Sequence, residues 1–110
     1  MLSKINRLTS KKDFDIVFNK GKNFKIGSMV FKILKSDFNK IRVGFVVSKK
    51  VSNKATIRNK VKRRMRSIVQ GQLVNISSSA DIIIIALPGI QKEEFLDVKK
   101  DIATFFKKTF

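Results

Sequence analysis

Hydrophobic positions recur with a helical period in some stretches of the chain and alternate with polar ones in others. The first helical pattern predicts a short helix over residues 11–20. Ser10 and Asp13 have capping-box spacing at its start, and Gly21 stands where the pattern ends. The apolar face of this helix consists of Phe14, Val17 and Phe18.

Two stretches of alternation follow, and alternation predicts strands with one buried face. They cover residues 29–34 and 42–48, and the turn formers at 36–39 between them predict a hairpin. A further strand is expected near residues 23–26. One face of each strand is apolar: Met29, Phe31 and Ile33 in the first, and Val43, Phe45 and Val47 in the second.

The second half of the chain predicts a long helix, a buried strand and a final helix. The long helix covers residues 55–70 and is expected to end at Gly71. Residues 81–88 (DIIIIALP) predict a fully buried central strand, because the run is too short for a helix and rich in β-branched residues. The final helix covers residues 92–108. The apolar stripe of the long helix consists of Ile57, Val61, Met65, Ile68 and Val69, and that of the final helix of Phe95, Val98, Ile102, Phe105 and Phe106.

These elements predict one domain over residues 1–110, of the α+β class. Their order is α-β-β-β-α-β-α, which is typical of a two-layer sandwich with helices packed against a mixed sheet. A hydrophobic content of 43% in 110 residues is enough to form a core.

Composition narrows the function classes. The chain has no Cys and no His, so it lacks a thiolate site and the usual general base and metal ligand. The longest apolar run, residues 82–87, is too short to cross a bilayer, and the polar start lacks the apolar core of a signal peptide. We therefore expect a cytoplasmic protein with no membrane partner, no small-molecule substrate and no conventional side-chain catalysis.

Positive charge is concentrated in residues 49–66 (KKVSNKATIRNKVKRRMR), which carry nine basic side chains and no acidic one. Residues 1–70 have a net charge of +17 and residues 71–110 of zero, so the field attracts a phosphate backbone at long range. Like charges one helical turn apart cost roughly 0.2 to 0.5 kcal/mol per pair. A solvated surface and a phosphate-binding surface both fit this segment, and the uninterrupted positive sign favours phosphate. Asn59 in its middle is either an incidental surface residue or a group that donates and accepts hydrogen bonds.

Phe14 and Phe18 lie one helical turn apart, and two interpretations of the pair are open. The rings pack in the core, or they form the wall of a groove beside a polar face of the sheet. Aromatic rings next to cations are what single-stranded nucleic acid requires. The polar face of the sheet carries Lys32, Arg42, Gly44, Val46 and Ser48.

The order of these motifs resembles that of the protein component of bacterial ribonuclease P. The central signature is Arg58-Asn59-Lys60, followed by Lys62-Arg63 and Arg66. The match covers nearly the whole chain at family spacing. Further matching positions are Asn6-Arg7-Leu8, Asp13-Phe14, Val17-Phe18, Gly21, Arg42-Val43-Gly44, Ser48-Lys49-Lys50, Asn53 and Lys54-Ala55.

The resemblance implies a subunit of a ribonucleoprotein endoribonuclease, a hydrolase that removes the 5′ leader from precursor transfer RNA. In that family the catalytic site and its Mg²⁺ ions belong to the RNA subunit. The protein is therefore expected to have no catalytic residue and no metal site, and to be inactive alone. Its expected role is to strengthen and broaden substrate binding and metal-ion use by the RNA.

The resemblance also assigns two RNA-binding sites. The basic helix and the loop before it face the catalytic RNA, and the aromatic groove holds the single-stranded leader. The first site consists of Lys49, Lys50, Asn53, Lys54, Arg58, Asn59, Lys60, Lys62, Arg63 and Arg66. The second consists of Phe14, Phe18, Lys32, Arg42, Val46 and Ser48.

Two positions depart from the family pattern. Lys60 replaces the second Arg of the signature, which keeps the charge but loses the planar fork that grips phosphate. Lys32 stands where a third groove aromatic is usual, so leader contact there is expected to be electrostatic. Phe31 lies on the other face of that strand.

The fold that the resemblance implies is that of the second domain of small-subunit ribosomal protein five. It includes a left-handed βαβ crossover before the strand at residues 81–87, although general rules favour a right-handed one.

Two rival functions share parts of this pattern. A ribosomal or regulatory RNA-binding protein would have the same charge map, and the RNA that copurifies with the chain would separate it from a ribonuclease P subunit. A self-sufficient nuclease would need clustered carboxylates for metal. The acidic residues show no such cluster in the sequence: Asp13, Asp15, Asp37, Asp81, Glu93, Glu94, Asp97 and Asp101.

Overall fold

The computed structural model describes residues 4–36, 39–74 and 76–110. It contains three α-helices, two 3-10 turns and one four-stranded sheet within those residues. The α+β class and the predicted order of helices and strands are confirmed. The elements are a 3-10 turn at Lys4–Asn6, α1 at Lys11–Lys20, β1 at Lys22–Ile26, β2 at Met29–Lys35, β3 at Ile41–Val46, α2 at Ala55–Leu73, β4 at Ala80–Ala86, a 3-10 turn at Ile90–Lys92 and α3 at Phe95–Thr109.

The strand order in the sheet is β1-β2-β4-β3, so the hairpin predicted between β2 and β3 is wrong. β4 lies between these two strands, antiparallel to β2 and parallel to β3. The isoleucine-rich β4 is buried along almost its whole length, and a central position covers both of its edges and both of its faces. β2 pairs in a hairpin with β1 instead. The predicted turn falls partly on residues 37 and 38, which lie outside the described residues.

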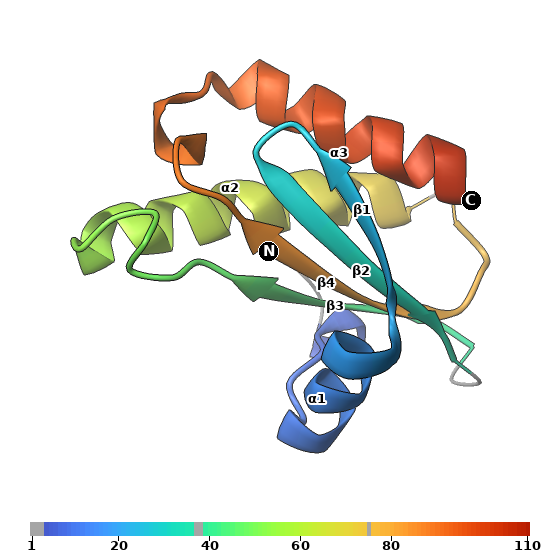
Figure 1. Cartoon of the computed structure of the whole chain (residues 1–110). Coiled ribbons are helices and arrows are strands. Elements are labelled where there is room, and N and C mark those ends of the chain that lie inside the picture. The colour runs from blue at the N-terminus through green and yellow to red at the C-terminus, as the bar shows by residue number, and fades with distance from the viewer. Residues whose placement is uncertain (1–3, 37–38, 75) are drawn as a thin grey trace.

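The helices lie on both faces of the sheet (Figure 1). α2 and α3 cover one face, where they bury the larger core cluster, and α1 covers the other. β3, α2 and β4 form the left-handed crossover that the sequence resemblance implied (Figure 1). The outer edge of β3 is covered by the start of the chain, because the Leu8 amide donates to the Val43 carbonyl at 3.0 Å. β1 is the other edge strand, and no strand among the described residues pairs with its outer side.

The apolar stripes of the two long helices face the core, with two corrections. Gly71 does not end α2, which continues to Leu73, because an exposed glycine weakens a helix without breaking its hydrogen bonds. α3 begins at Phe95 rather than residue 92, since a turn with Gly89 at φ +102° precedes it. Phe95 is consequently 38% exposed, and its predicted burial is wrong. The buried stripe residues are Val61, Met65, Ile68 and Val69 in α2 and Val98, Ile102, Phe105 and Phe106 in α3.

Candidate nucleic-acid interface

The loop between β3 and α2 presents four basic or polar side chains from a fixed backbone. Val47 and Val51 are buried and anchor the loop in the core. The Val51 amide donates to the Ser48 carbonyl at 3.1 Å, which closes a turn between them. Four residues of the predicted catalytic-RNA site lie exposed on this loop: Lys49, Lys50, Asn53 and Lys54.

The outer side of α2 continues this basic surface. The apolar stripe holds the helix on the sheet, so the remaining positions turn to solvent. In the described part of the chain, none of the cations at 49–66 forms an ion pair with an acid. The surface is therefore positive and not neutralised internally. Asn59, Lys60, Arg63 and Arg66 are exposed, and Arg58, Lys62 and Arg64 are half-buried.

Arg58 differs from its neighbours because its guanidinium is tied to the loop. Its Nη1 donates to the Ser52 carbonyl at 2.9 Å and to the Asn53 carbonyl at 3.0 Å. These bonds connect the first turn of α2 to the loop before it, at a helix start that has no side-chain cap. Arg58 thus shapes the basic surface as well as adding charge to it.

The aromatic pair on α1 combines both interpretations that the sequence left open. The rings of Phe14 and Phe18 are stacked, with centroids 6.4 Å apart and an angle of 17° between their planes. Phe14 is half-buried against β3, where a Cβ on Gly44 would come within 3.2 Å of its ring. Phe18 is 45% exposed. The pair therefore has one ring that packs and one ring that is available to a ligand.

Lys32 lies beside the exposed ring. Its Nζ is 4.6 Å from the centroid of Phe18 and donates to Asn23 Oδ1 at 2.9 Å. Its position on the α1 face of β2 brings a cation to the ring, as a cation–π contact. Phe31 lies on the opposite face of the same strand and is fully buried. The structure thus brings together Phe14, Phe18 and Lys32 of the predicted leader groove.

Arg42 is bonded to two carboxylates. Its Nε and Nη2 donate to the two carboxylate oxygens of Asp81 at 2.8 and 2.7 Å, and its Nη1 donates to Asp13 at 3.2 Å. The hydrogen bond to Asp81 is the main cause that raises the pKa of Arg42 above its usual value. This ion triad joins α1, β3 and β4 on the face that carries the aromatic pair.

The last two predicted groove residues lie along β3 and beyond it. Val46 is half-buried and packs against the core cluster under α1, as Phe14 does. Ser48 is exposed just after the strand, at the start of the basic loop.

Sequence reasoning missed Asp13 and Asp81 as partners of Arg42. The signal was the cross-strand register, which places Arg42 opposite Asp81 on adjacent parallel strands. The incorrect pairing of β2 with β3 concealed it.

In the described residues, no three His, Cys, Asp or Glu side chains gather where they could hold a metal ion. No helix among those residues combines the length and the apolar content needed to span a membrane.

The chain matches known proteins over almost its whole length. The sequence profile of the family described as Ribonuclease P matches residues 2–109. The Ribonuclease P protein component of Syntrophomonas wolfei is 32% identical over 108 residues, which is 98% of this chain and 90% of the relative. That of Streptococcus pneumoniae is 33% identical over 101 residues, which is 92% of this chain and 81% of the relative.

Solved structures agree with this assignment. The RNase P protein of Thermotoga maritima, determined in complex with 1-(4-fluorophenyl)-2-thiourea, superimposes with a TM-score of 0.84 at 29% identity, over 94% of this chain and all of that one. An RNase P protein mutant of Staphylococcus aureus with defective mRNA degradation activity gives 0.86 at 26% identity, over 96% of this chain and 88% of that one. The chain belongs to the ribonuclease P family.

Proposed function

We propose that the chain works as the protein subunit of ribonuclease P by holding a catalytic RNA on one surface and the 5′ leader of precursor transfer RNA on another. Membership of the family, which carries the role of a subunit in transfer-RNA processing, supports the proposal. The observation that carries it is the basic surface of the loop and α2, whose cations have no acidic partner in the described residues. The RNA supplies the chemistry and the Mg²⁺ ions, and the enzyme works in the cytoplasm.

The basic surface contacts the catalytic RNA through phosphates. Cations that lack internal partners gain most from releasing the counterions of a nucleic acid. The exposed Arg63 and Arg66 present planar forks for bidentate contacts, whereas Lys60 acts as a point charge. Asn59 lies exposed among them and supplies a hydrogen bond that a cation cannot make.

The groove holds the leader by stacking. Phe18 offers an exposed ring for a base, and the Phe14 ring stacks on that of Phe18. The Lys32 ammonium beside the Phe18 ring binds the phosphates of the leader. Val46 and Ser48 extend the groove along β3 toward the basic loop. The contact of Arg42 with the leader stays a prediction, and its bonds to Asp13 and Asp81 give it the further role of holding α1 against the sheet.

The purified protein alone should not cleave precursor transfer RNA, because the chain has no His or Cys and its described acids form no metal cluster. Mixed with its cognate RNA, it should raise cleavage most at low Mg²⁺ concentration, where few ions screen the repulsion between phosphates. The measurement is single-turnover cleavage of a 5′-labelled precursor with and without each component. Cleavage by protein that has been freed of RNA by nuclease treatment would contradict the proposal that the RNA carries the catalytic site.

Arg63→Ala should weaken binding to the catalytic RNA and reduce the slope of log K against log salt concentration by about 1, the value for one lost phosphate contact. Arg63 is the cleaner choice than Arg58 because it is exposed and makes no bond to the loop. The control is Lys100→Ala, an exposed cation on α3, within residues 71–110, whose net charge is zero. Equal losses in both variants, measured by filter binding at several salt concentrations, would remove α2 from the interface.

A further inference from the structure

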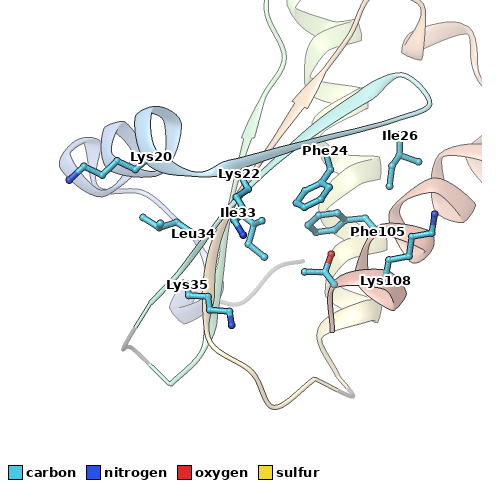
Figure 2. A pocket seen from close by; sticks show the side chains of 10 residues that line it. Lys20, Lys22, Phe24, Ile26, Ile33, Leu34, Lys35, Phe105 and Lys108 are labelled. Atoms are coloured by element: carbon cyan, nitrogen blue, oxygen red, sulfur yellow. The ribbon is translucent and has the colours of Figure 1, made fainter.

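We propose that a pocket between β1, β2 and the last turns of α3 binds one unpaired nucleotide of an RNA. The pocket has a volume of about 610 Å³ (Figure 2). Its aromatic floor belongs to the face of the sheet that α2 and α3 cover, whereas the leader groove lies on the α1 face. Lys20 of α1 and Leu34 also line the pocket, but none of the residues assigned to the basic surface or to the leader groove does, so the site is distinct from both.

The floor of the pocket is an aromatic cluster that includes one exposed phenylalanine. Phe105 is buried and stacks on Phe31 with centroids 4.2 Å apart. Phe24, on the edge strand β1, is 45% exposed, and its ring lies tilted by 58° to that of Phe105 with the centroids 6.3 Å apart. Ile26 and Ile33 line the floor beside it. A nucleobase stacks on such a ring because every base presents a flat π-face.

The rim of the pocket is positive. Lys22 comes from β1, Lys35 from the end of β2 and Lys108 from α3, so only the fold brings these cations around one apolar floor. Figure 2 shows the Phe24 and Phe105 rings between Lys22 and Lys108. Of the ten described residues that line the pocket, none is acidic. Lysines on both sides of a stacking ring match a base with a phosphate on each side.

An RNA fits this arrangement better than an acidic peptide or an anionic lipid. All three would meet the lysines, but every nucleotide combines a flat ring with negative charge, whereas acidic side chains and lipid phosphates have no flat ring. Thr109 also lines the pocket, and a threonine hydroxyl both donates and accepts hydrogen bonds, as the edge of a base does. The chain belongs to the ribonuclease P family, so RNA is a ligand that the protein is expected to meet.

The test is a titration of the full chain with a short single-stranded oligoadenylate, followed by NMR of isoleucine methyl groups. The methyl signals of Ile26 and Ile33 should shift, and they should still shift in Phe18→Ala, which removes the groove ring. Phe24→Leu should weaken the affinity at this site by about fivefold or more, the loss expected for one stacked base. Phe95→Leu is the matched control, because Phe95 is also partly exposed and lies outside the pocket.

A second variant, Lys22→Gln with Lys108→Gln, tests the rim without touching the packing, since both lysines are exposed. The double variant should also have a lower affinity for oligoadenylate, and the loss of affinity should be larger at low salt concentration. Unmoved Ile26 and Ile33 signals would overturn the pocket while leaving the leader groove intact. Larger shifts with polyglutamate or with phosphatidylglycerol vesicles than with the oligonucleotide would overturn RNA as the ligand.

The assembled enzyme identifies the source of the nucleotide. If it comes from the catalytic RNA, Phe24→Leu should weaken assembly of protein with RNA. If it comes from the substrate, assembly should be unchanged and binding of the precursor should weaken. No change in either would overturn the proposal.

Discussion

Asp81→Asn should lower the melting temperature of the protein by at least about 12 °C, the shift that a loss of about 3 kcal/mol causes in a domain of this size. The substitution removes a carboxylate that accepts two hydrogen bonds from Arg42, whose side chain is only 14% exposed, and leaves the bond from Arg42 to Asp13 at 3.2 Å. Removing one partner from a largely buried ion pair is among the costliest single changes in a folded protein. Thermal unfolding followed by circular dichroism at fixed salt measures the effect.

Asp15→Asn is the matched control, because it makes the same change of charge at an exposed position on α1. It should change stability by no more than about 0.5 kcal/mol. If the two variants melt at the same temperature, the triad does not stabilise the fold. Its position between α1, β3 and β4 would then need another explanation.

Phe18→Ala should weaken the binding of a precursor with a leader of several nucleotides by about 1 to 3 kcal/mol, the value of one stacked base. Mature transfer RNA, which has no leader, should bind as before. The side chain is 45% exposed, so its removal should cost far less stability than the roughly 3 to 5 kcal/mol of a core phenylalanine. Binding of both RNAs to the assembled enzyme, with the melting temperature of the variant, provides the test.

Ile16→Ala serves as the control for this prediction. Ile16 is an exposed apolar residue on α1, on the opposite side of the helix from the aromatic pair. It should leave both affinities unchanged. A large fall in melting temperature together with equal losses for both RNAs would show that Phe18 is a packing residue and would remove the groove from the proposal.

Local sequence patterns predicted the elements well because their causes are local. At the start of α1 the Ser10 hydroxyl accepts a hydrogen bond from the Asp13 amide, with 3.4 Å between Oγ and N, as the capping-box spacing predicted. Alternation located β2 and β3 and identified their apolar faces. Alternation could not identify which strands pair with β2 and β3. The face to which a side chain points depends only on its position in its own strand, whereas strand pairing depends on all strands of the sheet. β4 pairs with β3 through contacts between residues far apart in the sequence, which a local pattern does not reveal.

The candidate sites follow the same division. The basic surface was visible in the sequence because it needs only charge and helical period, and α2 supplies both. The state of Arg42 was not visible, because its partners come from residues 13 and 81. The Phe14 and Phe18 pair was found by spacing, but their different exposure depends on Gly44, which lets Phe14 approach β3.

The central position of β4 also sets an order of events during synthesis. Both β2 and β3 pair with β4, whose residues leave the ribosome after every other strand. Until residues 80–86 emerge, β3 has no strand partner and the core cannot close. The segment with a net charge of +17 precedes them, so the nascent chain exposes a polycation before it has a fold. Binding of this basic segment to nearby nucleic acid therefore competes with folding of the sheet. The outcome depends on how quickly β4 is synthesised after the basic segment.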